Sequence, residues 1–259
     1  MQERDPSFYL CRKDRGVEYF HAKSDVPVPT NQDNLILTYH KIGSPPSRPL
    51  LKRLYLPIAE FQAQIAMVLR NGFTGGVLAN CIALQQANRL TITFDDGYSS
   101  FLRETLDVLK QYSMKAIQFI VVDKIGAHND WDVARGEIAE PLMNRFQILE
   151  WLEAGHEIGA HSATHPHLTH CSPVQLCEEV CSSKKRLEDM FSIPIHHFCY
   201  PYGDFNLSVR DAVEDAGYQT ACTTIGGIHR IGDDPMQLRR YTARPVPSWL
   251  WLRRILKIR

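Results

Sequence analysis

The sequence predicts an α/β fold in which a parallel β-sheet is covered by helices. Short apolar segments rich in β-branched residues alternate along the chain with longer amphipathic segments. This alternation is typical of parallel strands that are connected by helices. The sheet can be open or closed into a barrel, and in both forms the functional residues lie on loops that leave the carboxyl ends of the strands.

Turn and capping residues delimit the predicted elements. Helices end at Gly72, Gly155 and Gly217, and Ser172 is an N-cap that is followed by proline in the first turn. The predicted strands are residues 35–39, 90–94, 116–122, 156–161, 197–200 and 220–225. The predicted helices are residues 58–70, 100–112, 142–154, 172–190 and 207–216.

The length of 259 residues suits one large domain with a sizeable core. We expect a polar N-terminal arm at residues 1–34, the domain at 35–247 and a basic, amphipathic tail at 248–259. Lysine plus arginine and aspartate plus glutamate each total 29, so there is no net charge to attract a polyanion. Nucleic acid is therefore not an expected partner.

The cysteines and the N-terminus indicate a compartment. The seven cysteines are an odd set without a Cys-x-x-Cys pair, which favours buried free thiols in a reducing environment. The first 20 residues carry charges of both signs and lack the apolar stretch of a secretory signal. No segment is apolar enough over sufficient length to span a bilayer, so we expect a cytoplasmic protein.

Two adjacent carboxylates follow the predicted strand 90–94. Asp95 and Asp96 precede Gly97, and neighbouring residues on a strand point to opposite faces. Both carboxylates can reach one site only if the strand breaks into a turn there, which Gly97 permits. The competing interpretation is an ordinary acidic turn after a strand.

Two histidines lie at the end of the predicted strand 156–161, the first as its last residue. His161 and His165 are separated by small residues, and four residues close one turn of chain, so both imidazoles can converge on one ion. The alternative is a surface histidine cluster, since His167 and His170 follow. With Asp96 they form three ligands for one divalent metal and leave positions open for water and substrate. Zinc suits this set, and cobalt, iron, manganese or nickel would also fit. Asp95 could then take a proton from a water molecule that the metal activates.

A third motif, Tyr200-Pro201-Tyr202-Gly203, follows the predicted strand 197–200. Proline and glycine flank Tyr202 and would hold a turn that presents its backbone N–H outward, where it could stabilise an oxyanion. The aromatic rings could line a sugar site. The alternative is an aromatic turn that packs on the sheet.

The three motifs together resemble the polysaccharide deacetylase family, also called carbohydrate esterase family 4 or NodB homology. The resemblance rests on Thr-Phe-Asp-Asp-Gly, His-Ser-x-x-His-Pro and Tyr-Pro-Tyr-Gly in this order, and it extends over residues 35–244. It implies a distorted (β/α) barrel in a single domain, a divalent metal, and removal of acetyl groups from N-acetylhexosamines in a glycan or glycolipid. By motif, it also implies Asp95 as general base, the ligands Asp96, His161 and His165, and an oxyanion contact from the backbone N–H of Tyr202.

The chain departs from the family pattern at two places. Many members have an arginine two residues before the proline of the third motif, where this chain has Cys199, so Asp95 must be oriented by another group. The Leu-x-His motif that usually supplies the general acid is missing, because residues 237–244 contain no histidine. His40 ends the first predicted strand and resembles the early histidine of one branch of the family, which makes it our predicted general acid. His229, on a glycine-rich loop, is the alternative.

Two further segments, residues 128–132 and the C-terminal tail, could contact a ligand. Residues 128–132 form a polar stretch after a strand, and Trp131 in it either stacks on a sugar or packs against the domain. In the tail, tryptophan beside basic residues suits an interfacial helix on anionic lipid at the inner membrane face. The alternative for the tail is a last helix that packs on the barrel.

Three other functions compete with that of a deacetylase. A catalytically inactive glycan-binding protein of the same fold would explain Cys199 and the missing histidine, but it would not explain why Asp95 is present. A structural metal site would need a fourth protein ligand, and none is apparent. Hydrolysis of another amide or ester would use the same metal chemistry.

Overall fold

The computed structural model describes residues 33–45, 49–81, 88–100, 102–230 and 232–255. The predicted arm up to residue 32 and the last four residues of the tail lie outside these ranges. Parallel pairing joins β1 to β5 and continues through β6, β7 and β8 to β9. The strands are β1 Asp33–Tyr39, β2 Lys41–Ile42, β3 Tyr55–Leu56, β4 Thr74–Gly75, β5 Arg89–Phe94, β6 Ala116–Ile120, β7 Glu157–Ala160, β8 His197–Cys199, β9 Thr220–Cys222, β10 His229–Arg230 and β11 Tyr241–Thr242.

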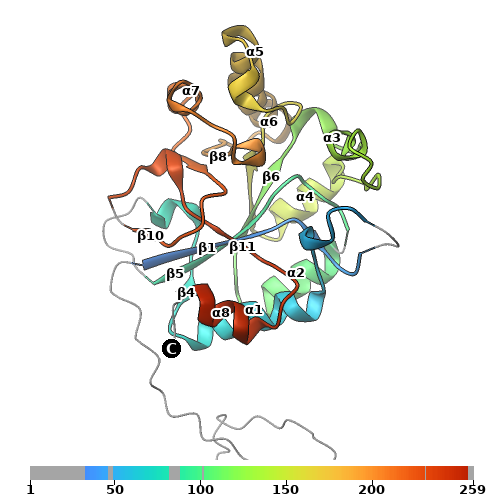
Figure 1. Ribbon diagram of the computed structural model, residues 1–259. Coiled ribbons are helices and arrows are strands. Elements are labelled where there is room, and N and C mark those ends of the chain that lie inside the picture. The colour runs from blue at the N-terminus through green and yellow to red at the C-terminus, as the bar shows by residue number, and fades with distance from the viewer. Residues whose placement is uncertain (1–32, 46–48, 82–87, 101, 231, 256–259) are drawn as a thin grey trace, which may run out of the picture.

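The main sheet is an incomplete barrel. Its order is β10-β1-β5-β6-β7-β8-β9, with β11 paired to β1 and β4 paired to β5, while β2 and β3 form a small separate sheet. Only β10 runs antiparallel to its neighbour β1. The prediction of a distorted (β/α) barrel is confirmed, and the strands of this sheet lie at the centre of the molecule with helices around them (Figure 1).

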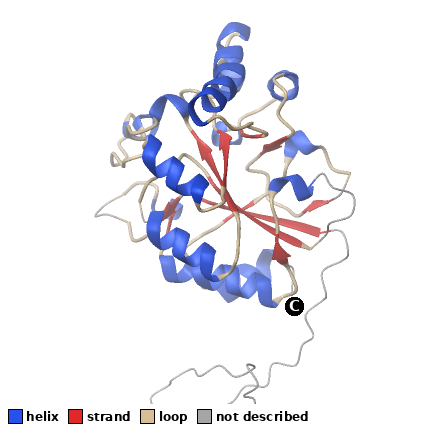
Figure 2. Cartoon of the chain, turned by 180° about the vertical axis from the view of Figure 1, so that it is seen from behind, coloured by secondary structure: helices blue, strands red, loops and turns tan. Residues whose placement is uncertain are grey.

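Helices surround the outside of this sheet (Figure 2). The helix predicted at residues 58–70 is confirmed at both ends, and the one predicted at 172–190 is a continuous run with a π-helical turn in its middle. The helices are α1 Ile58–Arg70, α2 Leu102–Gln111, α3 Asp130–Val133, α4 Arg145–Glu153, α5 Pro173–Cys177, the π-helical turn Glu178–Ser182, α6 Ser183–Phe191, α7 Leu207–Asp215 and α8 Ser248–Ile255.

The core lies between the sheet and these helices. Side chains of β1 and β5 are buried on both faces, as expected for parallel strands that helices cover. On the helix side, Phe94 of β5 packs against Tyr39, Phe61 and Trp151 with ring centroids 5.5 to 5.8 Å apart. None of the cysteines whose side chains are described, 171, 177, 181, 199 and 222, is in a disulfide.

The tail helix α8 packs on the domain. Trp251 and Ile255 are buried in the main core, and α8 contacts α1 (Figure 1). The alternative of a last helix packed on the barrel is thus confirmed for these two side chains, which cannot also face lipid. None of the helices in the described ranges combines the length and the apolar character that crossing a bilayer requires. Membrane contact through the remaining tail residues stays a prediction.

Candidate active site

The carboxyl ends of β1 and β5 bring the first three candidate residues together. Tyr39 and Phe94 are paired in register, so His40 and Asp95 each follow the last pair of the ladder. The N–H of Asp95 still donates to the carbonyl of Tyr39 at 3.0 Å. The chain then turns at Asp96 and Gly97, both of which have positive φ, of 74° and 82°. The two carboxylates therefore reach the same side, as the sequence predicted for a strand that breaks at this point.

The loop after β7 supplies the two histidines. His161 directly follows the strand, and positive φ at Ser162 and His165 coils the intervening chain tightly. The N–H of His165 donates to the Ser162 hydroxyl at 2.9 Å. Glu179, from the π-helical turn, accepts hydrogen bonds from the backbone N–H groups of Ala163 and Thr164, both at 2.9 Å. Glu179 thus holds the loop between the histidines from behind, a role that sequence reasoning missed because the residue lies on a separate helix.

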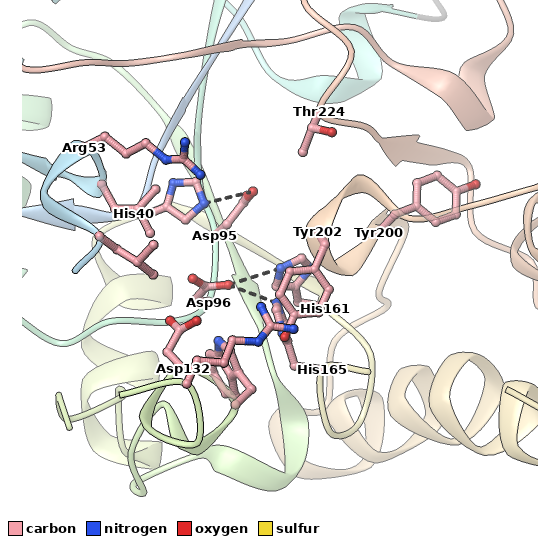
Figure 3. Close-up of a pocket in the computed structure, with 14 residues that line it drawn as sticks. His40, Arg53, Asp95, Asp96, Asp132, His161, His165, Tyr200, Tyr202 and Thr224 are labelled. Carbon is pink, nitrogen blue, oxygen red and sulfur yellow. Dashed lines mark ion pairs between the residues drawn. The ribbon is translucent and has the colours of Figure 1, made fainter. Parts of the chain in front are cut away.

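Asp96, His161 and His165 form a group that could hold a metal ion. The Nε2 atoms of His161 and His165 lie 3.2 and 3.4 Å from Oδ1 of Asp96, and all three side chains are buried (Figure 3). Their three candidate ligand atoms lie within 4.8 Å of one another. A divalent cation fits this group, because one carboxylate and two imidazole nitrogens already converge on a single point.

The surroundings shift the pKa values of the three candidate ligands in different directions. Burial would lower the pKa of His161, but Cys199 and Asp96 raise it well above its ordinary value. Nδ1 of His161 lies 2.7 Å from the carbonyl oxygen of Cys199, so it donates there and leaves Nε2 to face the metal position. Burial by itself would raise the pKa of Asp96, but hydrogen bonds from both histidines hold it well below its usual range. Burial lowers the pKa of His165, which favours the neutral imidazole.

Asp95 is fixed by Arg240, which the sequence analysis did not identify. Two guanidinium nitrogens of Arg240 lie 2.8 Å from the two oxygens of Asp95 in a bidentate pair. Arg240 also donates to the Thr93 hydroxyl and the Thr223 carbonyl, both at 3.0 Å, and is almost fully buried. Burial would raise the pKa of Asp95, and the Arg240 guanidinium holds it below its ordinary value. Asp95 is therefore a carboxylate that can accept a proton.

The short side chain of Cys199 explains how Arg240 reaches this position. The sulfur of Cys199 lies 3.6 Å from Asp95 and 3.1 Å from Nη2 of Arg240. A longer residue at this position would occupy the space that the guanidinium fills. The missing arginine of the third motif is thus replaced by one from residues 237–244, the segment where only a histidine was sought.

His40 and His229 lie at opposite ends of β1. Nε2 of His40 is 4.0 Å from Oδ2 of Asp95, and the side chain lines the cavity (Figure 3). His229 lies on β10 and pairs with Asn34 at the start of β1. It is fully buried there and does not line the cavity. The alternative of His229 as general acid is therefore wrong, because its loop turns back to the amino-terminal end of the sheet.

The third motif contributes to the site only in part. Tyr202 lines the cavity, and its φ of 58° turns the backbone as the flanking proline and glycine predicted. Its ring lies 4.5 Å from the ring of His165. The ring of Tyr200 points away (Figure 3), since its hydroxyl donates to the carbonyl of Met236 and the ring stacks on Phe205. Tyr200 thus borders the cavity while its ring packs in the core, and Pro201 is buried outside the cavity lining.

These residues surround a cavity of about 340 Å³, within the range of small-molecule sites. Trp131 lines the cavity, and its ring stacks on that of His165 with the centroids 4.5 Å apart. The sequence left open whether this ring contacts a sugar or packs against the domain, and in the structure it borders the cavity. Asp132 is buried at the wall, where the Tyr98 hydroxyl donates to it at 3.2 Å. The lining residues are His40, Leu51, Arg53, Leu54, Asp95, Asp96, Trp131, Asp132, Arg135, His161, His165, Tyr200, Tyr202 and Thr224.

An incomplete (β/α) barrel with such a ligand group beside a second carboxylate has the features of a hydrolase that uses a metal ion. Comparison with known proteins shows the family. The family model described as polysaccharide deacetylase matches residues 85–221. YxkH of Bacillus subtilis (strain 168), whose name describes a polysaccharide deacetylase, is 31% identical over 216 residues, which are 81% of this chain and 71% of that protein. The chain belongs to the polysaccharide deacetylase family.

Other relatives cover less of the chain or share only its fold. A peptidoglycan-N-acetylglucosamine deacetylase of Bacillus cereus is 29% identical over 132 residues, 51% of this chain and 54% of that protein. The crystal structure of BC0361, a polysaccharide deacetylase from Bacillus cereus, has a TM-score of 0.71 at 23% identity and covers 85% of this chain and 68% of that one. The deacetylase PplD of Streptococcus pyogenes has a TM-score of 0.72 at 20% identity, with coverage of 86% and 98%. These two structures support the fold.

Proposed function

We propose that this protein hydrolyses the N-acetyl group of an N-acetylhexosamine in a glycan or lipid-linked glycan. The observation that carries the proposal is the buried group of Asp96, His161 and His165 directly beside the Asp95–Arg240 pair. In this proposal the Asp96 carboxylate serves as a ligand, while Arg240 holds the Asp95 carboxylate ionised for proton transfer. This is the division of labour that hydrolysis by a metal-activated water requires.

Asp96, His161 and His165 would hold one divalent ion, with zinc the best match to these ligands. The ion, when bound, would supply Lewis-acid chemistry: it acidifies water and polarises a carbonyl. Asp95 would take the proton from the attacking water, because it is ionised and Arg240 fixes its orientation. A catalytically inactive binding protein would not need a carboxylate held in this way.

Tyr202 and His40 would complete the reaction. The N–H of Tyr202 is in the first turn of a short 3-10 helix, where backbone donors lack intrahelical acceptors, and it would donate to the developing oxyanion. His40 would then give a proton to the departing amine, since its Nε2 lies on the cavity side, 4.0 Å from Asp95. For the next turnover, the proton that Asp95 has gained can return to solvent through the open cavity, and His40 can regain a proton from the same solvent.

The test is acetate release from N-acetylglucosamine oligosaccharides by the purified protein with added zinc or cobalt. We expect release that a chelator abolishes and that Asp95→Asn lowers by about a hundredfold or more. Asp215→Asn, on the exposed end of α7, is the matched control and should leave the rate unchanged. Stoichiometric metal binding without acetate release from any substrate would instead support the glycan-binding protein.

A further inference from the structure

Two arginines at the cavity have no part in the proposed chemistry. Arg53, on the 3-10 helix Lys52–Leu54, lies beside His40 (Figure 3), and Arg135 follows α3. Both side chains are exposed and line the same cavity as the candidate ligands. Within the described ranges of the chain, neither guanidinium forms an ion pair with a carboxylate.

Arg135 is held in a defined position. Its guanidinium lies over the Tyr202 ring at 4.8 Å from the centroid, and Nη2 is 3.4 Å from Nε2 of His167. His167 in turn stacks on Tyr202 at 4.3 Å. Stacking on a ring leaves the edge of the guanidinium, with its N–H donors, free for a ligand. A merely solvated arginine would not need this support.

The acidic groups of the cavity are already satisfied by other partners. Asp95 is paired with Arg240, and Asp96 faces the two histidines and the proposed ion. The Asp132 carboxylate accepts a hydrogen bond from the Tyr98 hydroxyl. The buried ammonium group of Lys41 lies over the Tyr98 ring, 4.6 Å from its centroid. Arg53 and Arg135 are therefore surplus positive charges at the cavity, and arginine binds carboxylate and phosphate groups through paired N–H donors.

We propose that the substrate is an anionic glycan, in which carboxylate or phosphate groups next to the acetylated hexosamine contact Arg53 and Arg135. This inference rests on the proposed function and narrows its substrate class. Neutral chains of N-acetylhexosamine would leave both guanidinium groups without an anionic partner. An acidic glycan would replace the water around the two guanidinium groups with charge-assisted hydrogen bonds. These contacts would also position the acetylated hexosamine over the candidate metal ligands.

The first measurement is binding, with zinc-loaded Asp95→Asn protein so that no turnover occurs. The probes are an N-acetylglucosamine oligosaccharide, an oligosaccharide of equal length that alternates N-acetylglucosamine with glucuronic acid, and an N-acetylglucosamine oligosaccharide with a terminal phosphate. Calorimetry should show that an acidic probe binds about tenfold or more tightly than the neutral one. The two acidic probes distinguish carboxylate from phosphate.

The variants are Arg53→Gln and Arg135→Gln, singly and together, with Lys52→Gln as the matched control. Lys52 is an exposed cation on the same 3-10 helix, but it does not line the cavity. We expect the double variant to lose the preference for the acidic probe and the control to retain it, with unchanged melting temperatures. In wild-type turnover, the acidic preference should appear mainly in KM.

Two outcomes would overturn the inference: equal affinity for neutral and acidic probes, or a preference that survives the double substitution. Failure of the proposed function has a different signature. If no probe yields acetate with the wild-type protein while the arginine-dependent preference persists, the anionic-glycan site stands and the deacetylase proposal does not.

Discussion

At the scale of single residues, the orientation of Asp95 depends on a guanidinium that comes from a distant segment. Arg240 is 145 residues away in the chain, yet it forms both hydrogen bonds to this carboxylate. Cys199 occupies the position where the resemblance to the family implied an arginine, and its small side chain leaves the room that Arg240 fills. A bidentate pair fixes both the charge and the plane of the carboxylate. Cys199 and Arg240 together thus orient the Asp95 carboxylate.

We expect Arg240→Gln to lower kcat by about a hundredfold and to destabilise the fold by about 3 kcal/mol, because it leaves the buried Asp95 charge without its partner. Arg240→Lys keeps the positive charge but not the paired N–H donors of the guanidinium, and it should recover part of kcat. Metal content should not change. The control is Arg239→Gln at the exposed neighbour. Assays of kcat and KM, at a temperature below the melting temperatures of the wild-type and variant proteins, check this prediction. An unchanged kcat in Arg240→Gln would refute the positioning role.

At the scale of secondary-structure elements, the π-helical turn Glu178–Ser182 connects the outer helix to the candidate metal site. A π-turn inserts one residue into a helix and redirects the side chains beside it, and such turns occur often at functional sites. Here the turn contains Glu179, whose carboxylate contacts the loop between His161 and His165. The Glu179 carboxylate also accepts from the Thr164 hydroxyl at 2.6 Å. The strained loop, with its positive φ values, is held in this way.

Glu179→Gln should weaken metal binding by about tenfold to a hundredfold, the usual effect of losing a group that supports ligands from behind. The amide cannot accept all three hydrogen bonds with the strength of a carboxylate. Glu178→Gln is the matched control, because Glu178 is exposed and bonds only Ser182 and Arg186 among the described residues. Competition with a chelating dye measures the affinity. Equal affinities in the two variants would mean that the loop holds its shape without Glu179.

At the scale of the whole molecule, the chain closes its core by returning α8 to α1. Trp251 and Ile255 join the main core cluster, and the Tyr241 hydroxyl donates to the Ile255 carbonyl at 3.4 Å. The segment that ends in α8 also contains Arg240 and β11, which pairs with β1. Packing of the tail therefore supports the same wall of the barrel that supplies Arg240.

Trp251→Ala should cost about 3–5 kcal/mol of unfolding free energy, since it opens a cavity in the core. Leu250→Ala, at a side chain that is 50% exposed, should change it little. Denaturant unfolding measures both. If the two variants are equally stable, α8 does not contribute to the core in solution, and binding of the tail to anionic vesicles becomes the better explanation of its tryptophans.

The sequence alone determined the parallel α/β fold and the residues that directly follow its strands. The reason is local: apolar runs define strands, and Asp95, Asp96, His161 and His165 lie at strand ends that a parallel sheet must bring to one edge. The turn at Gly97 and the turn around Tyr202 were predicted for the same local reason, because glycine and proline favour turns. The positive φ of Tyr202 itself does not follow from its residue type.

The tertiary structure decided which distant groups complete the site. Arg240, Glu179 and Arg53 come from distant segments of the chain, and their positions depend on packing rather than on neighbouring sequence. The same applies to Tyr200, whose ring packs in the core, and to His229, whose loop returns to the far end of β1. Periodicity and motifs report what lies a few residues apart, whereas the partner of a buried charge is selected by the space and the charge of the folded interior.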